Sequence, residues 1–193
     1  MRYAEVIRKT KETDIVLKLD LDGQGLADIS TGIGFFDHML TALTTHSGIN
    51  LTLKVKGDTQ VDCHHTVEDT GIALGKAFKE ALGDKRGIVR FADCFLPMDE
   101  ALAFAALDVA GRSYLAYDSR FEYRLCGDYE TAVTEEFMRA FAFNAEVTLH
   151  IRAVYGANDH HITEALYKAL AHCIKTAVKV VGSEIPSSKG VLG

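Results

Sequence analysis

The sequence of 193 residues predicts an α+β fold made by tandem duplication, with two mostly antiparallel sheets and helices packed between or against them. Strand-like and helical stretches recur in a similar order in the two halves, and a His-His-x-x-Glu motif begins a helix in each. No linker of about 10 to 12 residues separates the halves. We therefore expect a single domain over 1–193, with halves at about 1–90 and 91–182 and a polar tail at 183–193.

In the first half, apolar and polar residues alternate along the expected strands, and apolar residues recur at helical spacing along the expected helices. Turns rich in Gly and Asp, at 22–25 and 57–58, interrupt these patterns. The expected strands are 2–9, 15–20 and 49–56, and the expected helices are 33–45 and 65–82.

The second half repeats the succession of helix, strand, turn and helix. Its turn lies at 156–159. Its expected strands are 102–109, 114–117 and 146–154, and its expected helices contain Phe137 to Ala142 and Ile162 to Val181.

Composition and charge exclude several classes of protein. With 48% hydrophobic and 25% charged residues, the chain is neither disordered nor of low complexity. A formal net charge of −6 provides no positive field for nucleic acid or an anionic membrane, so we expect neither partner. No signal peptide or membrane-spanning apolar run is recognisable, and the four cysteines form no C-x-x-C pair. These features predict a soluble cytoplasmic protein with reduced thiols.

The duplicated motif carries the chemistry. His64, His65 and Glu68 correspond to His160, His161 and Glu164 in the second half, each time after a turn. Residues four apart share one face of a helix, so the first His and the Glu of each motif aim at one point. The adjacent His is rotated by about 100° and serves a different ion. Imidazole and carboxylate donors without thiolate suit Mn²⁺, Fe²⁺ or Zn²⁺.

Aligning the halves through these motifs also pairs His38 with Glu136, because each precedes an apolar helical stretch and then a strand. We expect two metal sites, which close either within one chain or between subunits. The hypothetical ligand sets are His38, His65, His160 and Glu164 for one ion, and His64, Glu68, Glu136 and His161 for the other. The remaining histidines, which have no partner of ligand type in the repeat, are expected to be bystanders: His46, His150 and His172.

Six blocks of the sequence follow one another at 32–40, 62–69, 97–100, 108–112, 158–165 and 186–190. Together these blocks resemble the imidazoleglycerol-phosphate dehydratase family of histidine biosynthesis over essentially the whole chain. The resemblance implies a duplicated βαββα fold, two Mn²⁺ ions per active site at subunit contacts, and a homo-oligomeric shell of 24 subunits built from trimers. Glu136 departs from the commoner family pattern, which has His at this place; a carboxylate is also an acceptable Mn²⁺ ligand.

The resemblance also implies the reaction, which is the dehydration of D-erythro-imidazole glycerol phosphate to imidazole acetol phosphate. The proton lost is not acidified by a carbonyl, so two ions on the ring nitrogens would favour an imidazolate and a diazafulvene-like intermediate. Glu12 matches the family's acidic residue and is the candidate acid/base. The residues that match the family's phosphate contacts are Arg90, Arg112, Lys168, Ser188 and Lys189.

Two other functions compete with this interpretation. A dinuclear metal-dependent phosphate-ester hydrolase has a similar ligand chemistry, but it typically holds its ions about 3.5–4 Å apart and bridges them with Asp. A non-catalytic metal-binding shell has no need of Glu12, Arg90, Arg112 or Lys189.

Overall fold

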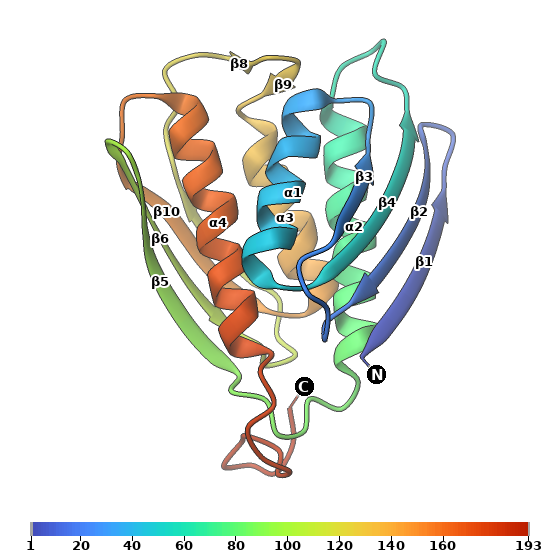
Figure 1. The fold of residues 1–193 in the computed structure, drawn as a ribbon, viewed down its shortest axis with the longest axis vertical. Coiled ribbons are helices and arrows are strands. Elements are labelled where there is room, and N and C mark those ends of the chain that lie inside the picture. Colours follow the sequence, from blue (N-terminus) through green and yellow to red (C-terminus); the bar gives the residue numbers. More distant parts are fainter. Residues whose placement is uncertain (1, 193) are drawn as a thin grey trace.

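A computed structural model describes residues 2–192, which form two similar halves (Figure 1). The first half runs strand, strand, strand, helix, strand, helix. Its elements are β1 (Tyr3–Lys9), β2 (Thr13–Asp20), β3 (Ala27–Ser30), α1 (Gly34–Ser47), β4 (Asn50–Gly57) and α2 (His64–Leu82).

The second half follows the same order, with a small hairpin inserted before its first helix. Its elements are β5 (Phe91–Met98), β6 (Ala101–Asp108), β7 (Tyr114–Asp118), β8 (Leu125–Cys126), β9 (Tyr129–Glu130), α3 (Val133–Ala145), β10 (Thr148–Tyr155) and α4 (Asp159–Ala177).

Each half contributes one four-stranded sheet with the same topology. The strand orders are β1-β2-β4-β3 and β5-β6-β10-β7. Most strand pairs are antiparallel, as expected, but β3 runs parallel to β4 and β7 runs parallel to β10. Both parallel pairs are joined through a helix, because a parallel connection must return the chain to the end from which it started. The predicted duplicated α+β fold is therefore confirmed.

The four helices lie between the two sheets (Figure 1). The helices pair across the halves, since α1 packs against α4 and α2 packs against α3. Alternation sets the inner face of each sheet: in β2, buried Ile15, Leu17 and Leu19 alternate with exposed Val16 and Lys18. The apolar core therefore fills the space between the sheets and holds the helices in fixed register.

Helix α4 ends at Ala177, so the prediction that it continues to Val181 is wrong. Beyond the helix, the backbone bonds to the segment that follows α2: Val89 donates to Lys179, and Val181 donates to Gly87. These bonds replace the helical pattern, and they leave the Val181 side chain 65% exposed. None of the helices in residues 2–192 is long and apolar enough to cross a membrane.

Two glycines bring α2 and α3 into close contact. A Cβ at Gly75 would lie 2.7 Å from the carbonyl oxygen of Phe141 and 2.8 Å from the backbone nitrogen of Ala145. At Gly71, a Cβ would lie 2.9 Å from the Phe137 oxygen. Because backbone atoms cannot rotate away as a side chain can, any larger residue must push the two helices apart.

We expect Gly75→Ala to lower the free energy of unfolding by about 1–3 kcal/mol, the usual range for overpacking. Helix propensity alone predicts the opposite sign, a gain of about 1 kcal/mol on replacing Gly by Ala. Urea unfolding distinguishes the two. The control is Lys76→Ala on the exposed side of the same helix, which should change stability by less than about 0.5 kcal/mol. A stabilised Gly75→Ala variant would refute the close packing of α2 on α3.

Candidate active site

All four helices begin at the same end of the molecule, the upper end in Figure 1. The sequence puts its candidate ligands in or near the first turns of these helices: His38 on α1, His64 on α2, Glu136 on α3 and His160 on α4. A shared helix direction therefore collects side chains from distant parts of the sequence at one end of the protein.

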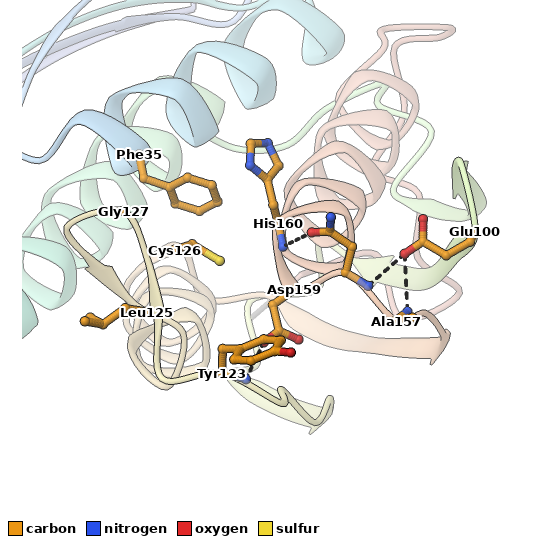
Figure 2. Close-up of a pocket in the computed structure, with 10 residues that line it drawn as sticks. Phe35, Glu100, Tyr123, Leu125, Cys126, Gly127, Ala157, Asp159 and His160 are labelled. Carbon is orange, nitrogen blue, oxygen red and sulfur yellow. Dashed lines mark hydrogen bonds between the residues drawn. The ribbon is translucent and has the colours of Figure 1, made fainter.

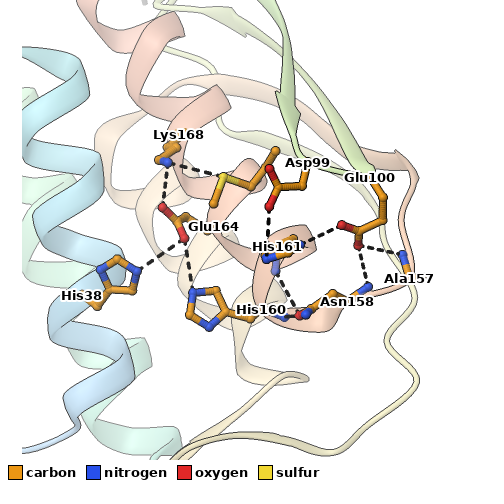
Figure 3. Close-up of polar contacts among 10 residues, drawn as sticks. His38, Asp99, Glu100, Ala157, Asn158, His160, His161, Glu164 and Lys168 are labelled. Carbon is orange, nitrogen blue, oxygen red and sulfur yellow. Dashed lines mark hydrogen bonds and ion pairs between the residues drawn. The ribbon is translucent and has the colours of Figure 1, made fainter.

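His38, His160 and Glu164 form a compact cluster between α1 and α4 (Figure 3). The Nε2 atoms of His38 and His160 lie 3.4 Å and 3.2 Å from Oε2 of Glu164. One ligand atom from each of the three residues lies within 4.8 Å of the other two. Two imidazole nitrogens and one carboxylate oxygen, with no thiolate, fit a divalent transition ion such as Mn²⁺.

Glu164 is the buried member of this cluster, with a side chain only 8% exposed. Its other oxygen, Oε1, forms an ion pair with Lys168 Nζ at 2.6 Å. Burial by itself would raise the pKa of Glu164, but the contacts with Lys168 and His38 together outweigh it, and the pKa lies below its ordinary value. The carboxylate is therefore charged at neutral pH and presents Oε2 to the two histidines.

The corresponding helix pair in the other half of the repeat is more open. His64 Nε2 lies 3.5 Å from Glu68 Oε2 on α2. Glu136, on α3, lies 3.9 Å from Arg139. Within residues 2–192, only His38, His160 and Glu164 bring three possible ligand atoms within 4.8 Å, so Glu136 does not close a similar cluster here.

The helix ends support the equivalence of His38 and Glu136. Helix α1 ends at Gly48 and α3 ends at Glu146, and both capping residues have left-handed backbone conformations. His38 stands ten residues before the first cap and Glu136 ten residues before the second. The pairing proposed from the order of motifs therefore agrees with the geometry of the two helices.

His65 and His161 belong neither to the cluster of His38, His160 and Glu164 nor to the His64–Glu68 pair, and each forms a hydrogen bond with a carboxylate. The Nδ1 atom of His65 lies 3.0 Å from Asp58, and that of His161 lies 2.7 Å from Glu100. These bonds raise the pKa of both histidines, and the His161 bond lowers the pKa of Glu100 to about 2. One chain thus brings together three of the four ligands in the first predicted set and leaves His65 on the other helix pair.

Most phosphate candidates lie at the opposite end of the molecule. Arg90 donates from Nε and Nη2 to Asp108 at 2.8 and 3.3 Å, and from Nη1 to the Pro186 oxygen at 2.8 Å. Arg112 approaches the same Asp108 carboxylate at 3.6 Å. Ser188 and Lys189 follow in the tail attached there. Lys168, by contrast, belongs with Glu164.

The length of helix α4 gives the distance between the candidate metal ligands and the candidate phosphate-binding arginines. His160 is its second residue, whereas the backbone of Arg90 donates to Ala177, its last residue. At 1.5 Å per residue, the 17 residue steps from His160 to Ala177 span about 25 Å. The three-carbon chain between ring and phosphate of imidazole glycerol phosphate is far shorter. One chain therefore does not hold the candidate metal ligands and these arginines around one such molecule.

An open cavity of about 440 Å³ adjoins the cluster (Figure 2). Its walls come from the first turns of α1 and α4 and from the β8–β9 hairpin, with the Phe35 ring edge-on to His160 at 4.9 Å. Asp128 of the hairpin accepts a hydrogen bond from Gly34 and fixes the start of α1. The hairpin was not anticipated from the sequence, because two-residue strands have no measurable alternation.

Two further carboxylates at the site received no role from sequence patterns. Asp58 follows β4, and Glu100 lies in the β5–β6 turn. Glu100 belongs to a block, Pro97 to Glu100, that matches the family, and this was the one available signal. Their partners became evident only when the fold brought them to His65 and His161.

The fold and the cluster define a duplicated α+β protein with histidine and carboxylate ligands on the first turns of its central helices. The family model for imidazoleglycerol-phosphate dehydratase matches residues 31–174. The chain belongs to the imidazoleglycerol-phosphate dehydratase family, and it is thus a hydro-lyase of histidine biosynthesis.

Individual relatives agree along the full length. Imidazoleglycerol-phosphate dehydratases from Methanosarcina mazei and Clostridium novyi are 53% and 51% identical, over 100% and 99% of this chain and 100% and 98% of their own. Crystal structures of the dehydratases from Staphylococcus aureus and Pyrococcus furiosus, the latter in complex with (S)-C348, both superpose with a TM-score of 0.83. They are 35% and 33% identical to this chain, of which they cover 94% and 97%, and they are themselves covered over 99% and 100%.

Metal titration tests the cluster. We expect His38→Ala to weaken Mn²⁺ binding at one site by more than about tenfold, because it removes an imidazole donor. The matched control is His46→Ala on the same helix, two turns further on and outside the cluster. Calorimetric titration of both metal-depleted variants gives the affinities. Equal affinity in the two variants would exclude His38 as a ligand.

Proposed function

We propose that this chain dehydrates D-erythro-imidazole glycerol phosphate to imidazole acetol phosphate with two Mn²⁺ ions per active site. The observation that carries the metal part of this proposal is the cluster of His38, His160 and Glu164 in a member of this family. The second motif, with His64 beside Glu68, supports a second ion, because it repeats the same His and carboxylate geometry. Bound divalent ions supply Lewis acidity to the imidazole ring of the substrate.

The ligands of the first ion are His38, His65, His160 and Glu164, and those of the second are His64, Glu68, Glu136 and His161. The Glu164 carboxylate is already oriented without an ion, because Lys168 binds Oε1 and Oε2 points toward the histidines. Preformed donors need less rearrangement when they bind an ion.

Glu12 acts as the acid/base. It is exposed in the turn between β1 and β2, and this turn lies at the end of the molecule where the helices begin. No hydrogen bond or ion pair engages the Glu12 carboxylate within residues 2–192. Its negative charge is close enough to His65 to raise the pKa of that ring, after the larger effect of Asp58. A free carboxylate beside the site can take the proton from the substrate carbon next to the one that loses hydroxide.

Arg90, Arg112, Ser188 and Lys189 hold the phosphate. Asp108 and the Pro186 oxygen use three of the five Arg90 donors. One N–H of Nη1 and one N–H of Nη2 are left to bind a phosphate. Lys168, which pairs with Glu164, completes the cationic groups near the substrate.

The active sites form between copies of the chain, in a homo-oligomer of 24 subunits built from trimers. The separation of about 25 Å along α4 supports shared sites, because the metal ligands of one chain then meet the arginines and tail of another. The acidic net charge supports the absence of nucleic-acid and membrane partners. Four free cysteines support a cytoplasmic location.

The enzyme assay separates this proposal from a phosphate-ester hydrolase and from a non-catalytic metal shell. We expect Mn²⁺-loaded protein to form imidazole acetol phosphate without releasing inorganic phosphate. Glu12→Gln should keep its metal content and lose roughly 10²–10⁴-fold in kcat, the usual contribution of general acid–base catalysis. Glu5→Gln in the adjacent strand is the control, since Glu5 faces Lys18 and not the ligands. Phosphate release, or full activity of Glu12→Gln, would contradict the proposed chemistry.

Mixed assemblies test whether sites are shared. We expect Glu164→Gln and Arg112→Ala chains to be nearly inactive alone and to regain activity when co-expressed. With random mixing, about a quarter of the shared sites take an unaltered Glu164 from one chain and an unaltered Arg112 from another. Product formation by the purified mixture is the measurement. No recovery in mixed assemblies, verified by mass spectrometry to contain both chains, would show that each site closes within one chain.

A further inference from the structure

Two ligand candidates are fixed by carboxylates that are themselves outside the predicted ligand sets. His161 meets Glu100 through Nδ1 at 2.7 Å (Figure 3), and His65 meets Asp58 through Nδ1 at 3.0 Å. The Nε2 atoms of both rings have no hydrogen-bond partner within residues 2–192. The exposed Asp99 carboxylate lies 3.7 Å from Nε2 of His161. In both rings, one nitrogen is thus engaged and the other is open.

Glu100 is itself held in place. Its Oε1 accepts hydrogen bonds from the backbone of Asn158 at 2.8 Å and Ala157 at 3.3 Å, so its Oε2 faces His161. Asn158 in turn caps α4 by accepting from the backbone of His160 and His161. The β5–β6 turn, the cap and the histidine therefore form one connected set of hydrogen bonds.

We propose that Glu100 and Asp58 are positioning residues, which hold the proton of His161 and His65 on Nδ1 and leave Nε2 free to bind metal. The proposal rests on the proposed function, since it assigns the proton positions in its two ligand sets. A carboxylate on the non-ligating nitrogen fixes both the tautomer and the direction of a metal-binding imidazole and makes the other nitrogen more basic. The other three candidate ligands, His38, His64 and His160, each direct Nε2 toward Glu164 or Glu68. All five histidines would therefore bind metal through Nε2.

The carboxylates that bond to His161 and His65 do not occupy equivalent positions in the two halves. Glu100 directly precedes β6, and its counterpart directly preceding β2 is Glu12. In the first half His65 is held by Asp58, from the loop after β4, so Glu12 is not needed for that purpose. The duplication therefore supplied two carboxylates at corresponding turns, of which one positions a ligand and the other stays available for proton transfer.

Mn²⁺ titration of the assembled, metal-depleted protein tests this assignment. We expect Glu100→Ala to weaken one of two Mn²⁺ sites by about 10- to 100-fold, the usual effect of removing such a partner, and to leave the other unchanged. Glu100→Gln should weaken it less, because the amide oxygen still accepts from Nδ1. Asp58→Asn should reproduce the Gln result at the other site.

Two controls make the outcome specific. Glu80→Gln removes one negative charge from the exposed, far end of α2 and should not alter either affinity. Glu12→Ala should change both affinities much less than Glu100→Ala changes its one site, while lowering kcat, which separates the two equivalent turns. Wild-type protein that binds no Mn²⁺ would overturn the proposed function and this inference together. Wild-type protein that binds two ions, with Glu100→Ala binding both equally well, would overturn this inference alone.

Discussion

The packing of helices across the two halves is the constraint on which the rest of the molecule depends. If α1 packed with α2 of its own half, His38 would not meet His160 and Glu164. Because α1 packs with α4, the cluster takes its ligands from positions more than a hundred residues apart in the sequence. The close approach of α2 to α3 at Gly71 and Gly75 is the corresponding contact on the other side. Ligand geometry is therefore a property of the interface between the halves.

Duplication explains the order of the elements but not the state of each site. The two sheets share one topology and the two motifs begin equivalent helices. Yet one cluster is closed around a buried Glu164, while His64, Glu68 and Glu136 remain more open. The two equivalent carboxylates differ in burial and in local partner: Glu164 is 8% exposed and pairs with Lys168, whereas Glu68 is 42% exposed and the sequence has Ile72 at the position that corresponds to Lys168. Similar backbones thus carry sites of different electrostatic character.

Most of the fold was predictable, because its signals are periodic. Alternation in β2 and helical spacing in α2 located these elements within a few residues. The end of α4 was not, since Val178 to Val181 continue an apolar pattern and only their bonds to Gly87 and Val89 end the helix. The hairpin β8–β9 and the edge strand β3 were missed for a similar reason, because they are short and depend on tertiary partners. The edge strand β7 was predicted at 114–117, but its parallel pairing with β10 was not.

The site was predictable to the extent that its residues repeat. His38 was found through the repeat, and the structure brings it to His160 and Glu164. The roles of Lys168 and Glu100 could not be derived this way, since their partners are set by rotamers and turns. Lys168 shows what such a contact adds: bound to Oε1 at 2.6 Å, it limits Glu164 to one free oxygen. A buried carboxylate with one free oxygen would offer that oxygen alone to a metal ion, and its charge is already partly balanced by the lysine.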